Sequence, residues 1–185
     1  MNAGITRPRT YVVMGVCGAG KSHIGALLAG HIGAVFDDSD DYHLPANRAK
    51  LAAGIPLTDE DRRPWYERLR ARIVEVRSQG RAHVVACSAL RVSLRDWLRA
   101  EDPPDALQFI LLQSPRELIE ARMRNRPDHF MPPSLIGSQL ATLEVTDDLL
   151  CVKNEGAPEL VLEALLARIE APGLRQFRSP HFLSL

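Results

Sequence analysis

The chain has few cysteines, and their spacing does not suit a covalent or metal cross-link. Cys17, Cys87 and Cys151 are odd in number, far apart and without a C-x-x-C pair, which argues against a disulfide framework and against a zinc site. No stretch approaches the roughly 20 apolar residues of a transmembrane helix. Residues 1–10 contain two arginines but no apolar core, so they do not resemble a secretory signal. These absences predict a cytoplasmic protein with no membrane partner.

The chain also lacks an excess of charge of either sign. Its 185 residues include 23 basic and 23 acidic side chains, so the formal charges cancel. Without an overall positive field, we expect no nucleic acid partner. Any anionic ligand must instead meet a local cluster of arginine and lysine. The hydrophobic fraction of 45% is typical of a globular protein with a sizeable core.

What the chain does contain is a complete phosphate-binding loop of the form G-x-x-x-x-G-K-S. The loop consists of Gly15, Val16, Cys17, Gly18, Ala19, Gly20, Lys21 and Ser22. An apolar run at 11–14 precedes it and a helix-like run at 24–29 follows, a context that a chance glycine-rich turn would not share. In such a loop, backbone N–H groups point at an anion, Lys21 reaches the β- and γ-phosphates, and the Ser22 hydroxyl ligates Mg²⁺. The motif therefore predicts binding of a nucleoside triphosphate.

Short apolar runs alternate with segments of helical spacing along the rest of the chain. Five runs are typical of buried strands: 11–14, 34–36, 83–87, 107–112 and, more weakly, 149–152. Strands that alternate with helices predict a parallel sheet covered on both faces. Ligands of such a sheet collect at the carboxyl ends of its strands, where the phosphate-binding loop also lies.

The end of the chain is expected to differ from the rest. The segment 160–169 is apolar enough for a packed terminal helix, with Pro158 tolerated in its first turn. Residues 171–185 show no periodicity and are expected to form a tail. We therefore expect a single domain over 1–185 with a core of about 10–170.

A run of carboxylates follows the second predicted strand, at Asp37, Asp38, Asp40 and Asp41. Such crowding is unfavourable unless a cation or a proton transfer uses the charges. Because the second strand of such a sheet is expected to end near the first, these acids would face the γ-phosphate. The alternative is an acidic, solvated loop. The neighbouring phosphate-binding loop favours the functional interpretation, since a hydroxyl acceptor needs a carboxylate to orient it and take its proton.

The block that follows is far more specific than the phosphate-binding loop. Residues 54–65 read G-I-P-L-T-D-E-D-R-R-P-W, and 38–65 as a whole closely resembles the gluconokinase pattern D-x-D-x-x-H…N-x-x-K-M-x-x-G-x-P-L-x-D-x-D-R-x-P-W. The resemblance continues through 87–91, 95–96, 122–130 and 139–144, so that it covers roughly 11–155. Departures are small: Leu51 stands where Met is usual, and Cys17 where Ser is frequent.

The resemblance implies a fold and an activity. The fold is an α/β P-loop kinase of the nucleoside-monophosphate-kinase type, with three layers, a parallel sheet and a mobile lid. The activity is ATP-dependent phosphorylation of D-gluconate to 6-phospho-D-gluconate, with ATP and Mg²⁺ as cofactors. The resemblance also suggests a homodimer.

The resemblance further implies roles for individual residues. Asp40 holds the 6-hydroxyl and acts as base, and Asp38 helps to order Mg²⁺ through water. Candidates for the sugar-acid subsite are His43, Arg62, Ser88, Arg91 and Arg95. The planar fork of arginine suits bidentate capture of a carboxylate. The alternatives are that each arginine is structural and that Ser88 caps a strand end.

The segment 122–130 is expected to form the lid. By analogy with related small P-loop kinases, Arg122 contacts the adenine, Arg126 clamps the transferring phosphoryl group, and Arg124 between them shares the work. The alternative is a basic, solvated helix face. The expected catalytic residues are Lys21, Asp40 and Arg126.

Two tryptophans are open to more than one interpretation. Trp65 and Trp97 each lie in or beside a helix-like segment with apolar neighbours. Core packing is therefore favoured over a role as stacking platforms.

Three other functions fit the sequence less well. A kinase of the same fold for another small hydroxyl acceptor, such as shikimate, is disfavoured by the motif block at 54–65. A nucleotide-operated switch of the GTPase class would carry an N-K-x-D motif, which the sequence lacks. A nucleic-acid-processing ATPase is disfavoured by the short, neutral chain.

Overall fold

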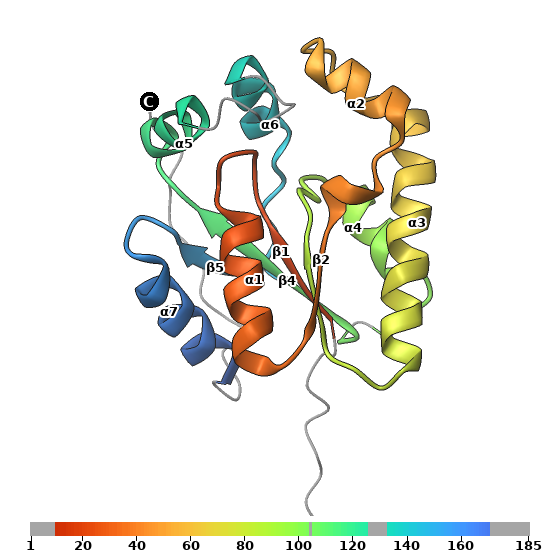
Figure 1. Cartoon of the computed structure of the whole chain (residues 1–185), viewed down its shortest axis with the longest axis vertical. Coiled ribbons are helices and arrows are strands. Elements are labelled where there is room, and N and C mark those ends of the chain that lie inside the picture. The colour runs from red at the N-terminus through yellow and green to blue at the C-terminus, as the bar shows by residue number, and fades with distance from the viewer. Residues whose placement is uncertain (1–9, 104, 126–132, 171–185) are drawn as a thin grey trace, which may run out of the picture.

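The computed structural model describes residues 10–103, 105–125 and 133–170. The predicted tail at 171–185 and the predicted clamp Arg126 lie outside these ranges. The described residues form three layers, with a central sheet between two layers of helices (Figure 1). The predicted α/β fold class is confirmed.

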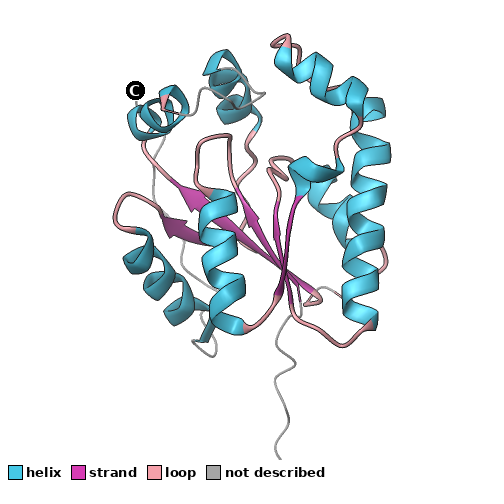
Figure 2. Ribbon diagram, viewed as in Figure 1, coloured by secondary structure: helices cyan, strands magenta, loops and turns pink. Residues whose placement is uncertain are grey.

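Within the described residues, five parallel strands make the sheet, and each overlaps one of the predicted apolar runs. They are β1 (Thr10–Met14), β2 (Val35–Asp38), β3 (His83–Ala86), β4 (Leu107–Gln113) and β5 (Leu150–Lys153), in the order β2-β3-β1-β4-β5. Figure 2 shows the strands in magenta between the helices. β3 thus lies between β1 and β2. β2 runs beyond the predicted segment because Asp37 and Asp38 pair with Val85 and Ala86 of β3. The strand itself therefore carries two carboxylates to the edge of the sheet.

Seven α-helices in the described ranges surround the sheet. They are α1 (Lys21–Ile32), α2 (Pro45–Ala52), α3 (Asp59–Ser78), α4 (Val92–Arg99), α5 (Arg116–Arg124), α6 (Ile136–Thr142) and α7 (Pro158–Glu170), with short 3₁₀ turns η1 (Ser39–Tyr42) and η2 (Pro133–Leu135). Figure 1 shows α1 and α7 on one face of the sheet and α3 and α4 on the other. Helices α2, α5 and α6 gather beyond the carboxyl ends of the strands (Figure 1). None of the described helices combines the length and apolar character needed to span a bilayer.

The central strand β1 is buried on both faces, as a parallel sheet between two helical layers requires. Successive side chains of a strand point to opposite faces. Tyr11 and Val13 accordingly belong to the core against α1 and α7, whereas Val12 and Met14 belong to the core against α3 and α4. Burying one such apolar side chain stabilises the fold by about 1.5–3 kcal/mol. This double burial holds the strand that delivers the phosphate-binding loop.

The exposed amino end of α3 is held by a capping box and by two side chains of α2. Thr58 and Asp61 form a capping box, in which each side chain accepts a hydrogen bond from the backbone N–H of the other. The Lys50 ammonium of α2 donates to Asp61 at 2.7 Å, and Asn47 Nδ2 donates to the Asp61 carbonyl at 2.8 Å. These contacts fix where α3 begins and hence where its first turns, which face the site, are presented.

Candidate functional site

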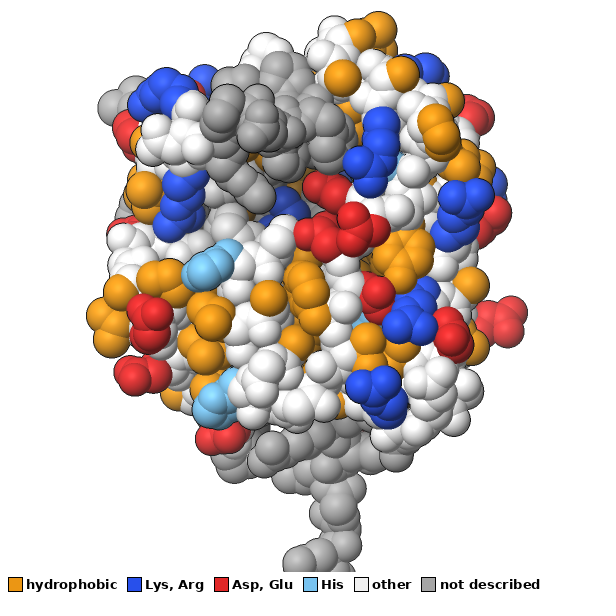
Figure 3. All heavy atoms as spheres, in the orientation of Figure 1, with side chains coloured by type: hydrophobic (Ala, Val, Ile, Leu, Met, Phe, Trp, Pro, Cys, Tyr) orange, Lys and Arg blue, Asp and Glu red, His pale blue; other side chains and the backbone are white. Residues whose placement is uncertain are grey.

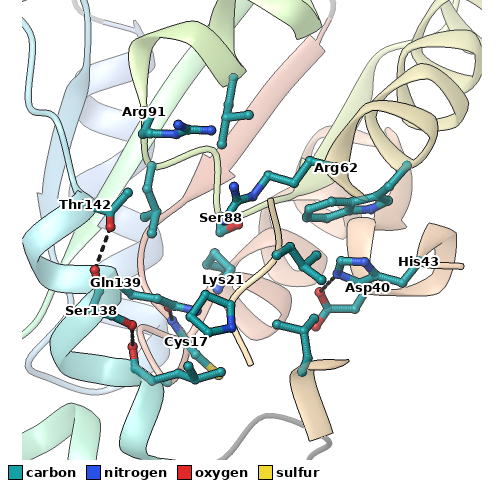
Figure 4. Close-up of a pocket in the computed structure, with 18 of the residues that line it drawn as sticks. Cys17, Lys21, Asp40, His43, Arg62, Ser88, Arg91, Ser138, Gln139 and Thr142 are labelled. Atoms are coloured by element: carbon teal, nitrogen blue, oxygen red, sulfur yellow. Dashed lines mark hydrogen bonds and ion pairs between the residues drawn. The ribbon is translucent and has the colours of Figure 1, made fainter. Parts of the chain in front are cut away.

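A cavity of about 140 Å³ lies where the strands end, between the phosphate-binding loop, η1, α3, the loop after β3, and α6. It is lined by nine of the residues predicted for the site: Cys17, Gly18, Lys21, Ser22, Asp40, His43, Arg62, Ser88 and Arg91. Figure 4 shows the side chains of Cys17, Lys21, Asp40, His43, Arg62, Ser88 and Arg91 reaching one space from several elements. Residues predicted for the donor and for the acceptor are thus brought to the same cavity.

The phosphate-binding loop needs glycine where its backbone is left-handed and crowded. Gly18 has φ +80°, and a Cβ built there would lie 2.9 Å from Met123 Cγ on α5. Gly20 has φ +90°, and its Cβ would lie 2.5 Å from Asn154 Nδ2. Gly20 is the N-cap of α1, the helix end at which unpaired N–H groups attract anions. The loop therefore closes tightly between α5 and the segment after β5.

The two side chains at the start of α1 that are predicted to bind the nucleotide, Lys21 and Ser22, are hydrogen-bonded to other groups of the protein. Lys21 Nζ donates to the Val16 carbonyl at 3.0 Å, folding back over its own loop. Ser22 Oγ donates to Asp38 Oδ2 at 2.5 Å. Although β3 separates β1 from β2, the end of β2 thus reaches the phosphate-binding loop, as the sequence predicted.

The donor set around Ser22 suits magnesium better than a metal held by protein alone. In the described part of the chain, no group of three or more His, Cys, Asp or Glu side chains is placed to hold a metal ion. The Ser22 hydroxyl and the Asp38 carboxylate nevertheless put two oxygens side by side. Mg²⁺ prefers oxygen ligands and takes few from protein, completing its shell with phosphates and water.

Asp40 is placed by a local turn that begins at Asp38. Asp38 Oδ1 accepts a hydrogen bond from the Asp40 N–H at 3.0 Å and so caps η1. The Asp40 side chain remains 34% exposed, lines the cavity, and has its Oδ1 3.8 Å from His43 Nε2. A carboxylate in this position is accessible to a hydroxyl bound in the cavity.

A second network behind the cavity holds the same turn. Asp37 accepts hydrogen bonds from Tyr42 at 2.8 Å, from Arg72 at 3.0 Å and from His83 at 2.8 Å. Burial alone would raise the pKa of Asp37, but these three hydrogen bonds lower it. Since Tyr42 ends η1, the charge on Asp37 ties the turn to α3 and β3.

His43 forms a buried, polar part of the cavity wall. Its side chain is 2% exposed, and its ring stacks on Trp65 with centroids 3.8 Å apart. Burial, assisted by the charges of Arg48 and Arg62, lowers the pKa of His43 to about 4. The ring is therefore neutral near pH 7 and can both donate and accept hydrogen bonds.

Trp65 combines the predicted core packing with a place in the site that the sequence did not predict. It is 4% exposed, its Nε1 donates to the Ser39 carbonyl at 2.7 Å, and it lines the cavity beside His43. Trp97 meets the edge of Tyr66 at 5.9 Å between centroids and does not line the cavity. Trp97 therefore packs without reaching the cavity, whereas Trp65 packs in the core and also forms part of the cavity wall.

Two arginines face the acceptor side of the cavity and share one carboxylate. Arg62 Nη1 lies 3.1 Å from Asp59 Oδ1, and Arg91 Nη2 is paired with the same oxygen. Arg91 follows a loop in which Ala89 adopts φ +42°, a conformation that is strained for a residue with a Cβ. That loop also brings Ser88 to the cavity. Strain in a loop that presents polar groups to a cavity is typical of functional sites.

Arg95 does not reach the cavity, contrary to its predicted place in the sugar-acid subsite. It is fully buried, and its guanidinium donates to the carbonyls of Ala89 and Leu90 at 3.2 Å and of Glu144 at 3.0 Å. It also donates to Thr146 Oγ1 at 3.1 Å. Carbonyl groups rather than a ligand satisfy these N–H groups, so Arg95 fastens the loop that carries Ser88 and Arg91 and is not retained as a substrate ligand.

Arg122 lies against the segment after β5 and next to the phosphate-binding loop. Its Nη1 donates to Ser114 Oγ at 3.2 Å and its Nη2 to the Asn154 carbonyl at 3.1 Å, and Asn154 Nδ2 donates to the Ala19 carbonyl at 2.7 Å. Arg122 does not line the cavity and lies beside the phosphate-binding loop, where its Nη1 would be 3.8 Å from a Cβ built at Gly20. The sequence did not predict Asn154, because its contact spans 135 positions of the chain.

Helix α6 supplies cavity residues that the sequence did not predict. Ser138, Gln139 and Thr142 line the cavity, and Gln139 Oε1 accepts a hydrogen bond from the Cys17 N–H at 2.7 Å. The available signal was the family resemblance over 139–144, which includes Gln139 but assigned it no role. Local patterns carried no such signal, since a polar side chain on a short helix is usually solvated.

Charges of both signs meet at this edge of the molecule. Figure 3 shows acidic side chains gathered over the end of β2 and basic side chains above them. Such a juxtaposition can bind a cation next to anionic phosphates and still attract an acidic acceptor.

The chain is similar to known kinases in sequence and in fold. It is 40% identical over 168 residues to a gluconokinase of Gluconobacter oxydans (strain 621H), which covers 89% of this chain and 93% of that protein. It is 39% identical to the gluconokinase of Sinorhizobium meliloti 1021, whose crystal structure matches with a TM-score of 0.76 over 88% of this chain and 91% of that one. A shikimate kinase of Acinetobacter baumannii in complex with shikimate is 22% identical, with a TM-score of 0.54 over 89% of this chain and 93% of that one, a likeness of fold alone. No protein-family model matches the chain.

Proposed function

The chain belongs to the gluconokinase family, and from that premise we propose that it transfers the γ-phosphoryl group of ATP to the 6-hydroxyl of D-gluconate. The products are ADP and 6-phospho-D-gluconate. One observation carries the proposal at the level of residues. The phosphate-binding loop, the carboxylate of Asp40 and the arginine pair Arg62 and Arg91 border the same cavity.

The donor half of the site is assigned to the loop at 15–22 and to Arg122. Backbone N–H groups of the loop and the Lys21 ammonium bind the phosphates of ATP, and the charge of Lys21 offsets the negative charge that moves toward the β-phosphate. Arg122 contacts the adenine side of the nucleotide, in line with its position beside Gly20 and Asn154. Arg126, outside the described residues, stays the proposed clamp of the transferring phosphoryl group.

Magnesium belongs to this proposal through the two oxygens at Ser22 and Asp38. The Ser22 hydroxyl would ligate the ion and Asp38 would order it, directly or through water. When bound, Mg²⁺ neutralises charge on the β- and γ-phosphates. The 2.5 Å contact between these two side chains supports a shared task.

Asp40 acts as the base in the acceptor half. The 6-hydroxyl of gluconate donates its proton to the Asp40 carboxylate while its oxygen attacks the γ-phosphorus. The bond from the γ-phosphorus to the bridging oxygen of ADP breaks, and ADP leaves with the electron pair. Because the transition state is loose, positioning the hydroxyl in line contributes most of the effect.

The remaining lining residues recognise the sugar acid. Arg62 and Arg91 take the carboxylate, since their guanidinium groups lie together at the end of the cavity formed by α3 and the loop after β3. Neutral His43 and Ser88 bind hydroxyl groups. Trp65 supplies an apolar surface for the carbon chain.

Three broader expectations belong to the same proposal and are supported by the family and the sequence. The chain forms a single domain over 1–185, it assembles as a homodimer, and it is cytoplasmic. Size-exclusion chromatography with light scattering measures the oligomeric state. A monomer at micromolar concentration would contradict the homodimer.

A coupled assay of ADP release tests the proposed function. ATP turnover is measured with Mg²⁺ and with gluconate, with shikimate or with no acceptor. We expect stimulation by gluconate alone, and a product whose phosphate is an ester of the 6-hydroxyl by ³¹P and ¹³C NMR. Turnover that ignores gluconate, or that shikimate stimulates equally, would overturn the proposal.

A further inference from the structure

The arginine pair Arg62 and Arg91 already has a carboxylate partner within the protein, the side chain of Asp59. Its Oδ1 accepts from Arg62 Nη1 at 3.1 Å and is paired with Arg91 Nη2. Both arginines line the cavity, and Asp59 does not. The cavity therefore presents two guanidinium groups whose shared counter-ion sits just outside it.

The geometry makes Asp59 a replaceable partner. Its side chain is 47% exposed, whereas those of Arg62 and Arg91 are 22% and 26% exposed. Asp59 can turn into solvent without burying its charge, while the arginines stay against the cavity. As the first residue of α3, Asp59 also keeps a favourable interaction with the helix dipole in either position.

The pair of arginines is not saturated by Asp59. In the part of the chain that the structure describes, both arginines form their ion pair with Asp59, so two positive charges share one carboxylate at this end of the cavity. Arg91 Nε is buried and has no hydrogen-bond partner among the residues that the structure describes. A second carboxylate can therefore be attracted to the pair even while Asp59 is present.

We propose that Asp59 is an internal competitor for the acceptor carboxylate, and that it sets the affinity for gluconate by requiring an exchange of counter-ions at Arg62 and Arg91. This inference rests on the proposed function, because it takes the arginine pair to be the carboxylate subsite. The gluconate carboxylate displaces the Asp59 carboxylate, which moves to solvent. The exchange transfers no proton. One carboxylate replaces another, so the net charge at the arginine pair is the same before and after the exchange.

The alternative role for Asp59 is only to hold the two arginines in position. The two roles predict opposite effects when the charge is removed. If Asp59 competes, its loss lowers the gluconate KM, because the arginines no longer have to release a carboxylate. If Asp59 holds the arginines in position, its loss raises the gluconate KM, because the arginines lose their orientation.

The test measures gluconate KM, ATP KM and kcat for Asp59→Asn and for Asp59→Ser, which is also well tolerated near a helix start. For both variants we expect the gluconate KM to fall about three- to tenfold, the size of removing one partly screened charge a few ångströms from a carboxylate. The ATP KM and kcat should stay within about twofold, because in the described structure the Asp59 side chain pairs with Arg62 and Arg91 and with no residue of the phosphate-binding loop. Inhibition by D-glucitol, which offers the same hydroxyl groups without a carboxylate, should not change.

Glu60→Gln is the matched control. Glu60 lies in the same first turn of α3, is exposed and makes no ion pair in the described structure. It removes the same charge from the same helix end, so its gluconate KM should stay within about twofold of wild type. Thermal unfolding of all three variants confirms that each is folded.

The outcomes separate this inference from the proposed function. If the wild-type protein shows no turnover with gluconate, the proposed function fails whatever Asp59 does. If the wild type uses gluconate but the Asp59 variants leave its KM unchanged or raise it, the inference alone is overturned. An equal fall in the glucitol inhibition constant would also overturn it, since the effect would then not depend on the carboxylate.

Discussion

The side-chain oxygen of Gln139 accepts a 2.7 Å hydrogen bond from the backbone N–H of Cys17, and this contact joins α6 to the phosphate-binding loop. The same side chain lines the cavity. Gln139 is therefore placed at the boundary between the donor and acceptor halves of the site. An amide is the neutral group that can satisfy a loop N–H there without repelling a phosphate.

Changing Gln139 to Glu should weaken ATP binding. A carboxylate next to the loop would repel the phosphates, and we expect the ATP KM to rise about tenfold, the equivalent of roughly 1.4 kcal/mol. Gln139→Ala, which removes the contact without adding charge, should change the ATP KM by less than about threefold. Steady-state kinetics with ATP varied at saturating gluconate measures both. Equal effects of the two substitutions would show that charge at this position does not matter.

Changing Asp40 to Asn should abolish most turnover while sparing the nucleotide. Loss of the base should reduce kcat by about 10²–10⁴-fold, because the amide cannot take the hydroxyl proton. The affinity for ATP, measured by fluorescence titration with a labelled nucleotide, should change little. Asp41→Asn is the matched control, since Asp41 is the exposed next residue and does not line the cavity. Full activity of the Asp40 variant would remove Asp40 from the mechanism.

The buried His43 should make stability depend on pH. Its pKa of about 4 in the folded protein lies below the ordinary value of 6.5, so the unfolded chain takes up a proton first as the pH falls. The stabilisation is complete above pH 6.5 and is lost progressively between pH 6.5 and about 4, by at most about 1.4 kcal/mol per pH unit. Urea unfolding at several pH values, compared between wild type and His43→Gln, isolates this contribution because other titrating groups cancel. A difference between the two proteins that is constant from pH 7 to 4.5 would contradict the depressed pKa.

Two glycines at opposite ends of α1 should respond in opposite ways to alanine. At Gly30, a Cβ would meet no atom within 4 Å, so Gly30→Ala should stabilise the protein by about 0.5–1 kcal/mol and leave activity unchanged. At Gly20, φ is +90° and the Cβ would lie 2.5 Å from Asn154 Nδ2, so Gly20→Ala should destabilise the protein and raise the ATP KM. Thermal unfolding and ATP kinetics on both variants check the pair. Similar shifts at the two positions would show that the left-handed backbone of the loop is not required.

The sheet could be predicted from the sequence because its signal is local. The central strands β1, β3 and β4 are apolar runs that are buried between the helical layers, and each described strand overlaps its predicted segment. The end of β2 could not be predicted, because Asp37 is polar and is kept in the strand by partners on α3 and β3. The apolar pattern stops before the hydrogen-bonded ladder does.

Site residues could be predicted only where a motif or the family resemblance pointed to them. The loop at 15–22 and Asp40 belong to motifs whose chemistry follows from their residues. Gln139 and Asn154 contact the same loop from 122 and 135 positions away, and no local pattern announces such contacts. Arg91 and Arg95 are alike in sequence, and only the fold shows that one faces the cavity and the other is buried.

That difference gives the last prediction, which contrasts the two arginines. Arg95 is buried and donates to the carbonyls of Ala89, Leu90 and Glu144, so Arg95→Ala leaves buried carbonyls without donors and a void. We expect a loss of stability of about 3 kcal/mol or more, with kcat and both KM values disturbed together as the loop loosens. Arg91→Ala should leave stability within about 1 kcal/mol and raise the gluconate KM selectively, by about tenfold or more, because it removes a charge that the acceptor carboxylate uses. Urea unfolding and steady-state kinetics on the two variants separate the roles. A selective rise in gluconate KM for the Arg95 variant at unchanged stability would return Arg95 to the sugar-acid subsite, since a residue that only fastens the loop cannot discriminate between the two substrates without moving it.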